Sequence, residues 1–430
     1  MMSRQEKVKQ IEECLSQSEV NIWQLREFCL TGGGLINNDI RQRSWYKLVG
    51  IDPNQSVLSD DCPSTGTVDS IADILDDTDD DDDDDDHDDD HHDKVPILET
   101  SFSEDTELIS RDVGRAVYFR YKSLQETKKN NESLNFGDSG KNILTKIIVS
   151  TVSNNANGQG QGGGRRLNYY QGFHDVASVI FVTMPQKPEL ASKILQRIAL
   201  SHLRDAMKKD FTYSSALLET TFFPLLQVFD EELHDFLILR ELEPTVFLTW
   251  MITLFAHDIH DSEVASRLFD AILAFHPLLP LYLTLAILIH PKNRQKLFEA
   301  KNKEVGMLQV VATRLLSGLM NDFDTSHQDG FSAQEVIDVA LGFMKRIPPE
   351  SLLSLAKQYD LGQCKIVMKR SELLCLFNLP QSSAIVQPNI DSINEKEKMN
   401  LVDDNEKTIP TVFLPTKEYP NALIAAGISS

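Results

Sequence analysis

The sequence predicts an all-α protein, a single large helical domain with two disordered insertions and a mobile C-terminal tail. Three observations support this fold class. Apolar residues recur at helical spacing along most of the chain, two helix-capping boxes are present, and no stretch alternates apolar and polar residues as a half-buried strand would.

The first capping box predicts that the chain begins with an amphipathic helix. Ser3 and Glu6 form this box, because each side chain can bond the backbone N–H of the other residue. Val8, Ile11 and Leu15 follow at helical spacing and would form the apolar face of the helix.

Two further helices are expected near the end of the folded part. The second capping box, Ser332 with Glu335, precedes apolar residues spaced by four, three and four, namely Val336, Ala340, Phe343 and Ile347. Shortly before it, a full apolar stripe at helical spacing indicates another helix, formed by Leu308, Val311, Ala312, Leu315, Leu316 and Leu319.

Two segments are apolar on nearly all sides and are therefore expected in the core. Residues 246–256 contain Trp250 and Phe255 and should lie centrally. The longest apolar stretch, from Leu278 to Ile289, is only about a dozen residues, whereas a membrane span needs roughly 20. We interpret it as a buried core helix and expect the chain to be soluble.

Low-complexity segments divide the chain. A run from Asp76 to Asp93 is nearly all aspartate with a few histidines, and residues 153–164 are rich in Asn, Gln and Gly. Such segments carry too few apolar side chains to offset the entropy cost of ordering. We therefore assign 1–56 to N-terminal helices and the start of the domain, 57–96 to an acidic insertion, 97–360 to the main part with a Gly/Asn-rich insertion at 153–165, and 361–430 to a C-terminal helix and flexible tail.

Charge and cysteine content limit the possible partners and compartment. The chain has 42 basic and 65 acidic residues, a net charge of -23, so it should repel nucleic acid. Its cysteines are odd in number, show no CxxC spacing and follow no secretory signal, which favours a reducing cytoplasm. They are Cys14, Cys29, Cys62, Cys364 and Cys375.

The first candidate functional motif lies on a predicted helix in which Ile109 and Val113 belong to the buried stripe. Asp112 and Arg115 stand three residues apart beside that stripe and can therefore touch. One interpretation is an exposed ion pair worth under about 1 kcal/mol. The other is that Asp112 orients an arginine that points outward at a partner.

The second candidate motif runs from Leu167 to Asp175, directly after the Gly-rich insertion and before an apolar segment. It contains Tyr169, Gln171 and Gly172. Polar and aromatic residues where a loop enters a core helix often mark a functional site. The alternative is a packed helix start with a satisfied amide and a tolerated glycine.

Taken together, the two motifs resemble the signatures of the TBC-domain family of Rab GTPase-activating proteins. That family has an Ile-x-x-Asp-x-x-Arg helix and a Tyr-x-Gln-Gly segment, and both patterns are present here. A third signature, Gly followed by Arg-x-x-x-Trp, is matched by Gly34, Arg41 and Trp45, although the proline that usually follows the glycine is missing. Trp250-x-x-x-Leu254-Phe255 and Arg267-Leu268-Phe269-Asp270 are similar to the family's closing helices.

The resemblance implies a partner and a mechanism. The partner would be a GTP-bound Rab-family small GTPase, which carries the GTP and magnesium, so the chain needs no cofactor or metal of its own. Arg115 would be an arginine finger and Gln171 would position the attacking water. Asp112 would hold Arg115, Tyr169 and Gly172 would shape the glutamine loop, and Arg41 and Trp45 would belong to the fold or to the rim of the groove.

Several segments resemble the subgroup that acts on Rabs of the early secretory pathway, which implies a role in ER-Golgi traffic at ER or Golgi membranes. They are Phe173-His174-Asp175, His202-Leu203-Arg204-Asp205, Leu233-His234-Asp235-Phe236 and Phe275-His276-Pro277-Leu278. Members of this subgroup usually end in a membrane-anchoring helix, and this sequence shows none. We therefore expect membrane contact to be indirect, or to depend on an anchor that is missing here.

Two other functions are compatible with parts of the sequence. A metal-dependent HD-type phosphohydrolase could use His174 and Asp175, with further ligands from His202, His234, His257 and His260. A non-catalytic Rab-binding scaffold is the other, and it would be favoured had Arg115 or Gln171 been replaced. The segment 321–333 only faintly resembles a calcium loop, because His327 and Ala333 occupy the positions of its glycine and bidentate glutamate.

Overall fold

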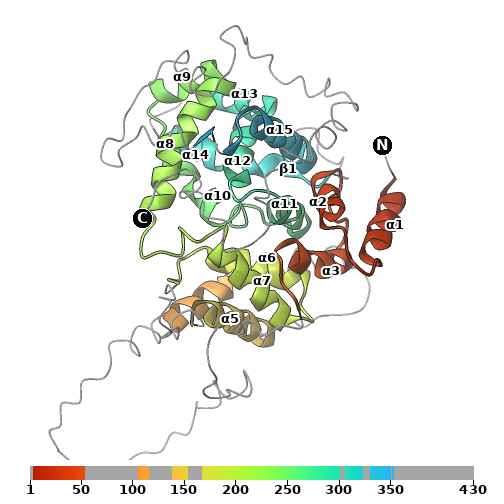
Figure 1. The fold of residues 1–430 in the computed structure, drawn as a ribbon. Helices are drawn as coiled ribbons and strands as arrows, with labels where there is room; N and C mark the ends of the chain where they lie inside the picture. The colour runs from red at the N-terminus through yellow and green to blue at the C-terminus, as the bar shows by residue number, and fades with distance from the viewer. Residues whose placement is uncertain are drawn as a thin grey trace, which may run out of the picture.

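The structure, a computed structural model, describes residues 3–53, 105–115, 138–153, 167–300, 306–322, 330–349 and 351–352. The predicted acidic insertion at 57–96, the tail at 361–430 and most of the possible calcium loop lie outside these ranges, as does the Gly/Asn-rich insertion apart from Ser153. The described residues form helices packed around one hydrophobic core, which confirms the all-α prediction (Figure 1).

Three helices form the N-terminal part, at the right of Figure 1: α1 (Arg4–Leu15), α2 (Ile22–Leu30) and α3 (Asn38–Leu48). The first capping box is formed only in part, since the Ser3 hydroxyl accepts the Glu6 backbone N–H at 3.2 Å. The amine of Lys7 joins α1 to the end of α2 by donating to the backbone oxygens of Phe28, Thr31 and Gly32.

The next elements form the lower part of the molecule in Figure 1. They are the helical stretch 105–115, α5 (Asp138–Ser153), α6 (Phe173–Thr183) and α7 (Pro188–Leu200). α5 packs against α7 and α6. Every residue of α6 is buried, and α6 in turn contacts α11 and α3, so it joins the lower part to the rest of the core.

The core elements follow in sequence order. They are α8 (Thr212–Phe229), α9 (Glu231–Leu239), the 3-10 helix η2 (Pro244–Phe247), α10 (Leu248–Ile252), α11 (Ser262–Ala274) and α12 (Leu279–Ile289). α12 is buried along its whole length, as predicted from its apolar sequence, and packs on α15. The predicted central segment 246–256 is central, but it comprises two short helices and a turn.

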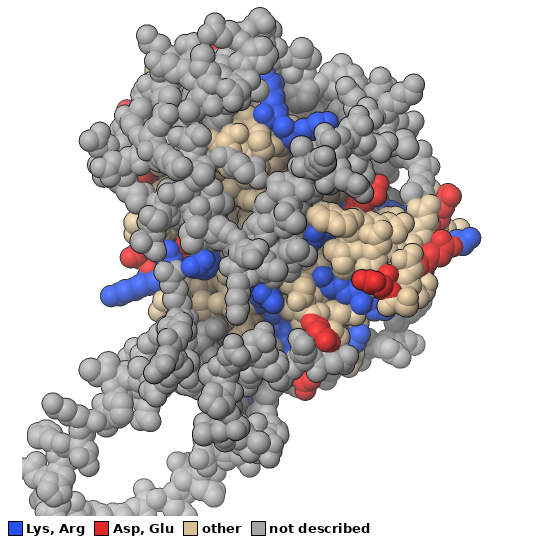
Figure 2. All heavy atoms as spheres, in the orientation of Figure 1, with Lys and Arg blue, Asp and Glu red and all other residues tan. Residues whose placement is uncertain are grey.

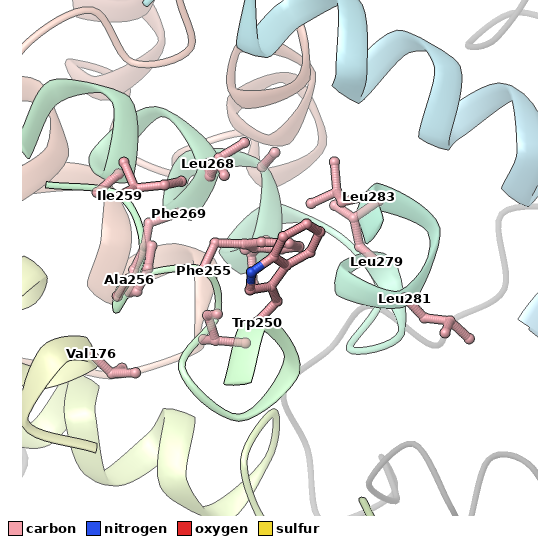
Figure 3. Packing of buried hydrophobic residues seen from close by; sticks show 14 of the residues in the cluster. Val176, Trp250, Phe255, Ala256, Ile259, Leu268, Phe269, Leu279, Leu281 and Leu283 are labelled. Carbon is pink, nitrogen blue, oxygen red and sulfur yellow. The ribbon is translucent and has the colours of Figure 1, made fainter. Parts of the chain in front are cut away.

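In the core, Trp250 of α10 lies between side chains from three other parts of the chain (Figure 3). Phe255 and Phe269 lie on one side of the indole, and Leu279 and Leu283 of α12 lie on the other. Trp250 is only 1% exposed, and its ring centroid lies 6.0 Å from that of Phe255. α10, the turn after it, α11 and α12 therefore share one packed centre.

The last part of the fold differs from the sequence prediction. It comprises α13 (Pro291–Glu299), α14 (Met307–Thr313), η4 (Leu315–Gly318), β1 (Leu319–Met320), β2 (Phe331–Ser332) and α15 (Ala333–Arg346). The stripe from Leu308 to Leu319 was expected to be one helix, and this prediction is wrong. The α-helix ends at Thr313, the stripe continues through the 3-10 helix η4, and Leu319 pairs in parallel with Phe331. Ser317 and Gly318 favour α-helix poorly, so the stripe does not continue as one helix to Leu319. The second capping box is complete, as predicted.

The charged side chains visible on one face are mixed in sign. Figure 2 shows basic and acidic side chains interspersed on the side where α1 to α3 lie. Within the described ranges, we find no helix with the length and apolar character that a membrane crossing requires.

Candidate functional site

The arginine motif lies on the helical stretch 105–115, which places its two charged residues very differently. Ile109 and Val113 are fully buried and anchor the helix in the core. Asp112 is 2% exposed, whereas the side chain of Arg115 is 63% exposed, and Nη1 of Arg115 lies 3.8 Å from Oδ1 of Asp112. A buried carboxylate therefore lies beside an arginine that is accessible to a partner.

The glutamine motif occupies the loop that enters α6. Tyr169 and Tyr170 are buried, and the next side chain, Gln171, is exposed. Gly172 is the N-cap of α6 and has φ +111°, and a Cβ atom there would lie 2.9 Å from Cγ2 of Thr253. The loop therefore requires glycine at this position, both for its backbone conformation and for the close approach of Thr253.

A buried hydrogen bond joins the two motifs. The hydroxyl of Tyr169 donates to Oδ2 of Asp112 at 3.1 Å, across 57 positions of sequence. Burial, followed by the nearby Asp112 carboxylate, raises the pKa of Tyr169, so its hydroxyl keeps its proton. Tyr169 stands two residues before Gln171, and Asp112 stands three residues before Arg115. The bond between Tyr169 and Asp112 therefore brings the two motifs together.

His174 is also part of this contact, a role beyond its place in the Phe173-His174-Asp175 segment and as a candidate metal ligand. Its Nδ1 lies 3.1 Å from the Tyr169 hydroxyl and accepts the backbone N–H of Gly172 at 3.2 Å. Burial lowers the pKa of His174, an effect that the neighbouring Asp175 partly opposes. Its place two residues after Gly172 was visible in the sequence, but its contacts with Tyr169 and Gly172 depend on the fold.

The end of α10 and the turn after it also contact the glutamine motif. The Tyr170 hydroxyl donates to the carbonyl of Ile252, and Nδ1 of His257 donates to Oδ2 of Asp175 at 2.8 Å. Within this turn, Leu254 and Phe255 have φ of 50° and 67°, a conformation that is strained for large side chains. The buried positions of both residues in the core hold the backbone in this conformation.

The third sequence signature lies in the interior and not at a surface groove. Arg41 and Trp45 of α3 are 1% and 0% exposed, and both bond Asp270 of α11. Nε of Arg41 lies 3.2 Å from each carboxylate oxygen, and Nε1 of Trp45 donates at 2.8 Å. Gly34 has φ +52°, and a Cβ atom there would lie 2.5 Å from Oδ2 of Asp270. The glycine, arginine and tryptophan therefore surround one buried carboxylate.

The structure brings only part of the six candidate metal ligands together. His257 bonds Asp175, which follows His174 in α6, whereas His202 and His234 have their partners elsewhere. His202 lies 3.3 Å from the carbonyl of Ile272, and His234 bonds its neighbour Asp235 at 2.9 Å. Among the residues that the structure describes, no group of three or more His, Cys, Asp or Glu side chains could hold a metal ion.

Comparison with known proteins gives the family. Residues 38–298 match the Rab-GTPase-TBC domain, a span that includes both candidate motifs. The chain is 25% identical over 287 residues to human TBC1 domain family member 20, covering 67% of this chain and 58% of that protein. It is 31% identical over 133 residues to the GTPase-activating protein gyp10 of Schizosaccharomyces pombe, covering 31% of this chain and 34% of that one.

A solved structure, the crystal structure of the Ypt/Rab-GAP domain of Gyp1p, aligns with 12% identity and a TM-score of 0.40, covering 73% of this chain and 98% of that one. The chain spans 58% of the length of its human relative. Since the domain match extends over more than half of the sequence, the chain belongs to the Rab-GTPase-TBC domain family.

Proposed function

We propose that this protein accelerates GTP hydrolysis by a Rab-family small GTPase, to which it supplies Arg115 and Gln171. One observation carries the proposal. Each motif has an exposed side chain that can reach a partner and a buried residue that holds it, and the two buried residues, Asp112 and Tyr169, bond each other at 3.1 Å. Membership of the Rab-GTPase-TBC domain family supports the same function.

Arg115 would stabilise the charge that develops on the transferred phosphoryl group. A small GTPase alone supplies little of this stabilisation, and an arginine finger adds about 10³- to 10⁵-fold in rate. That factor corresponds to roughly 4 to 7 kcal/mol at 1.36 kcal/mol per decade. Arginine suits the role because its guanidinium is always charged and can bond two oxygens at once. Asp112 would orient it from the buried side.

Gln171 would position the attacking water in place of the partner's own glutamine. Its side chain is exposed, while Tyr170 and Gly172 on either side are buried. The peptide that carries the amide is therefore fixed although the amide itself is free to reach outward, as catalysis by positioning requires. The GTP and the magnesium ion would arrive bound to the partner, and the proposed mechanism requires no cofactor of the chain's own.

For the natural substrates, we propose Rabs of ER-Golgi traffic. The segment Phe173-His174-Asp175 and three later segments resemble the subgroup that acts on the early secretory pathway. The subgroup that these segments resemble is typified by TBC domain family member 20, and the human protein of that name is 25% identical to this chain over 287 residues.

The test is single-turnover GTP hydrolysis by a panel of purified Rabs, with wild type, Arg115→Ala and Gln171→Ala. Arg111→Ala is a matched control, because Arg111 is an exposed arginine one turn earlier on the same helix. We expect wild type and Arg111→Ala to accelerate at least one Rab equally, and Arg115→Ala to abolish the acceleration. If wild type binds a Rab but does not accelerate its GTP hydrolysis, the result would instead support the scaffold alternative.

A further inference from the structure

We propose that His174 is a positioning residue that fixes the Gln171 loop against the arginine-bearing helix. This inference rests on the proposed function, because it concerns how Arg115 and Gln171 are held for GTP hydrolysis. His174 would touch neither the nucleotide nor the partner, since it is 6% exposed and lies beneath the loop.

A single nitrogen of His174 contacts both halves of the site. Its Nδ1 accepts the backbone N–H of Gly172, the residue next to Gln171, at 3.2 Å. The same Nδ1 lies in contact with the hydroxyl of Tyr169, at 3.1 Å, and the single proton of that hydroxyl is donated to Asp112 on the arginine helix. Removal of this nitrogen would leave the Gly172 N–H without its acceptor and would loosen the link to Asp112.

The bond from the Gly172 N–H requires neutral His174. A backbone N–H can only donate, so Nδ1 must carry a lone pair and the ring proton must be on Nε2. Nε2 lies 3.7 Å from Oδ2 of Asp175, so the ring proton on Nε2 is near a carboxylate oxygen. Protonation of the ring would place a second N–H on Nδ1, facing the N–H of Gly172, and the bond would be lost.

The surroundings of His174 favour the neutral form near pH 7. Burial is the largest influence and lowers its pKa, and His257 and Arg115 add to this effect. Asp175 and Asp112 oppose it by attracting the protonated ring. Because the pKa of His174 lies below the ordinary value for histidine, the ring is neutral near pH 7 and gains its second proton only in more acidic solution. We therefore expect GTPase activation to decline on acidification, at a pH below the ordinary pKa of histidine.

Two substitutions separate this role from general packing. His174→Leu fills the space with an apolar side chain of similar bulk but removes Nδ1. His174→Asn keeps an acceptor close to the Nδ1 position but cannot titrate. We expect His174→Leu to lower the stimulated kcat about 10- to 100-fold with little change in the concentration of protein needed for half-stimulation. We expect His174→Asn to recover most of the kcat and to lose the acid-induced decline, because asparagine does not titrate.

The experiment measures stimulated hydrolysis by a responsive Rab between about pH 7.5 and 5.5, corrected for the Rab alone at each pH. Circular dichroism at each pH checks that every variant remains folded. In parallel, ¹⁵N-histidine labelling resolves the 11 histidines, and the signal lost in His174→Asn identifies His174. We expect that signal to report a proton on Nε2 and none on Nδ1 at neutral pH.

The outcomes distinguish this inference from the proposed function. If wild type accelerates no Rab at any pH, the proposed function fails and the positioning role fails with it. If wild type is active but His174→Leu matches it in kcat and pH profile, only the present inference is overturned. An Nδ1–H tautomer of His174 at neutral pH would also overturn it, whatever the kinetics.

Discussion

At the scale of single residues, the site depends on buried polar groups that hold exposed ones. Arg115 and Gln171 are accessible, whereas Asp112, Tyr169 and His174 are buried, with the Tyr169 hydroxyl bonded to Asp112 and in contact with His174. The sequence could predict the two exposed residues, because each stands in a recognisable motif. It could not predict the bond from Tyr169 to Asp112, because 57 positions separate them and only the packing of the helices brings them together.

The Tyr169 hydroxyl offers a residue-scale test. Tyr169→Phe keeps the ring but removes the bond to Asp112, so a buried carboxylate loses a donor at a cost of about 1 to 3 kcal/mol in the free energy of unfolding. We also expect the stimulated kcat to fall, because Arg115 loses its support. The matched control is Tyr282→Phe, which removes a buried hydroxyl bonded to the carbonyl of Ile347, away from the site. Urea unfolding should show a loss of stability for both variants, and single-turnover kinetics should show a loss of activity only for Tyr169→Phe.

At the scale of elements, the helices that begin with a capping box or consist of a long apolar run were the most predictable. Periodicity and caps identified α1, α12 and α15, because each presents a sustained apolar face or a capping box. Short elements were less predictable. The apolar spacing from Leu308 to Leu319 fits a single helix, but the α-helix ends at Thr313 and Leu319 belongs to β1. The strained turn at Leu254 and Phe255 had no signal in the sequence, since neither residue ordinarily favours positive φ.

Gly172 provides the element-scale prediction. Gly172→Ala should lower the free energy of unfolding by about 1 to 3 kcal/mol, because its φ of +111° is strained for alanine and its methyl group would press on Thr253. Displacement of the loop should also reduce GTPase activation. Gly342→Ala in α15 is the control, because nothing lies within 4 Å of its added methyl group and alanine favours a helix interior. Equal thermal stability of Gly172→Ala and wild type would show that the loop tolerates a side chain there.

At the scale of the whole molecule, the fold buries titratable groups as well as apolar ones. Asp270 lies at the junction of α3 and α11, where Arg41 and Trp45 bond it. From sequence, these two residues were expected either in the fold or at the rim of a groove, and their burial places them inside. A single sequence could not decide between the two, because the partner carboxylate lies 229 positions from Arg41.

Buried histidines should make the stability of the whole fold depend on pH. Burial lowers the pKa of His202, His276 and His290 to about 4 from the ordinary 6.5. Between these pH values the unfolded chain binds more protons than the folded one, so stability falls as the pH decreases from about 6.5 to 4. For His276, 5% exposed, the loss between about pH 7 and 5 is on the order of 2 kcal/mol.

His276→Asn tests that contribution directly. Nδ1 of His276 accepts the backbone N–H of Leu278 at 3.0 Å, and an asparagine oxygen can replace it without titrating. Urea unfolding of both proteins at about pH 7 and pH 5 should show a smaller acid-induced loss for the variant. Identical losses in the two proteins would mean that His276 is not held neutral by the fold.

The central claim is that Arg115 acts on a partner's nucleotide, and the most direct test is the single-turnover rate of GTP hydrolysis by a responsive Rab at saturating protein. Arg115→Ala should lower the stimulated rate by about 10³-fold or more, while Arg111→Ala on the same helix should match wild type. Arg115→Lys should recover little, because an ammonium cannot bond two phosphoryl oxygens in the same plane. Full stimulation by folded Arg115→Ala would contradict the account and place the catalytic cation elsewhere.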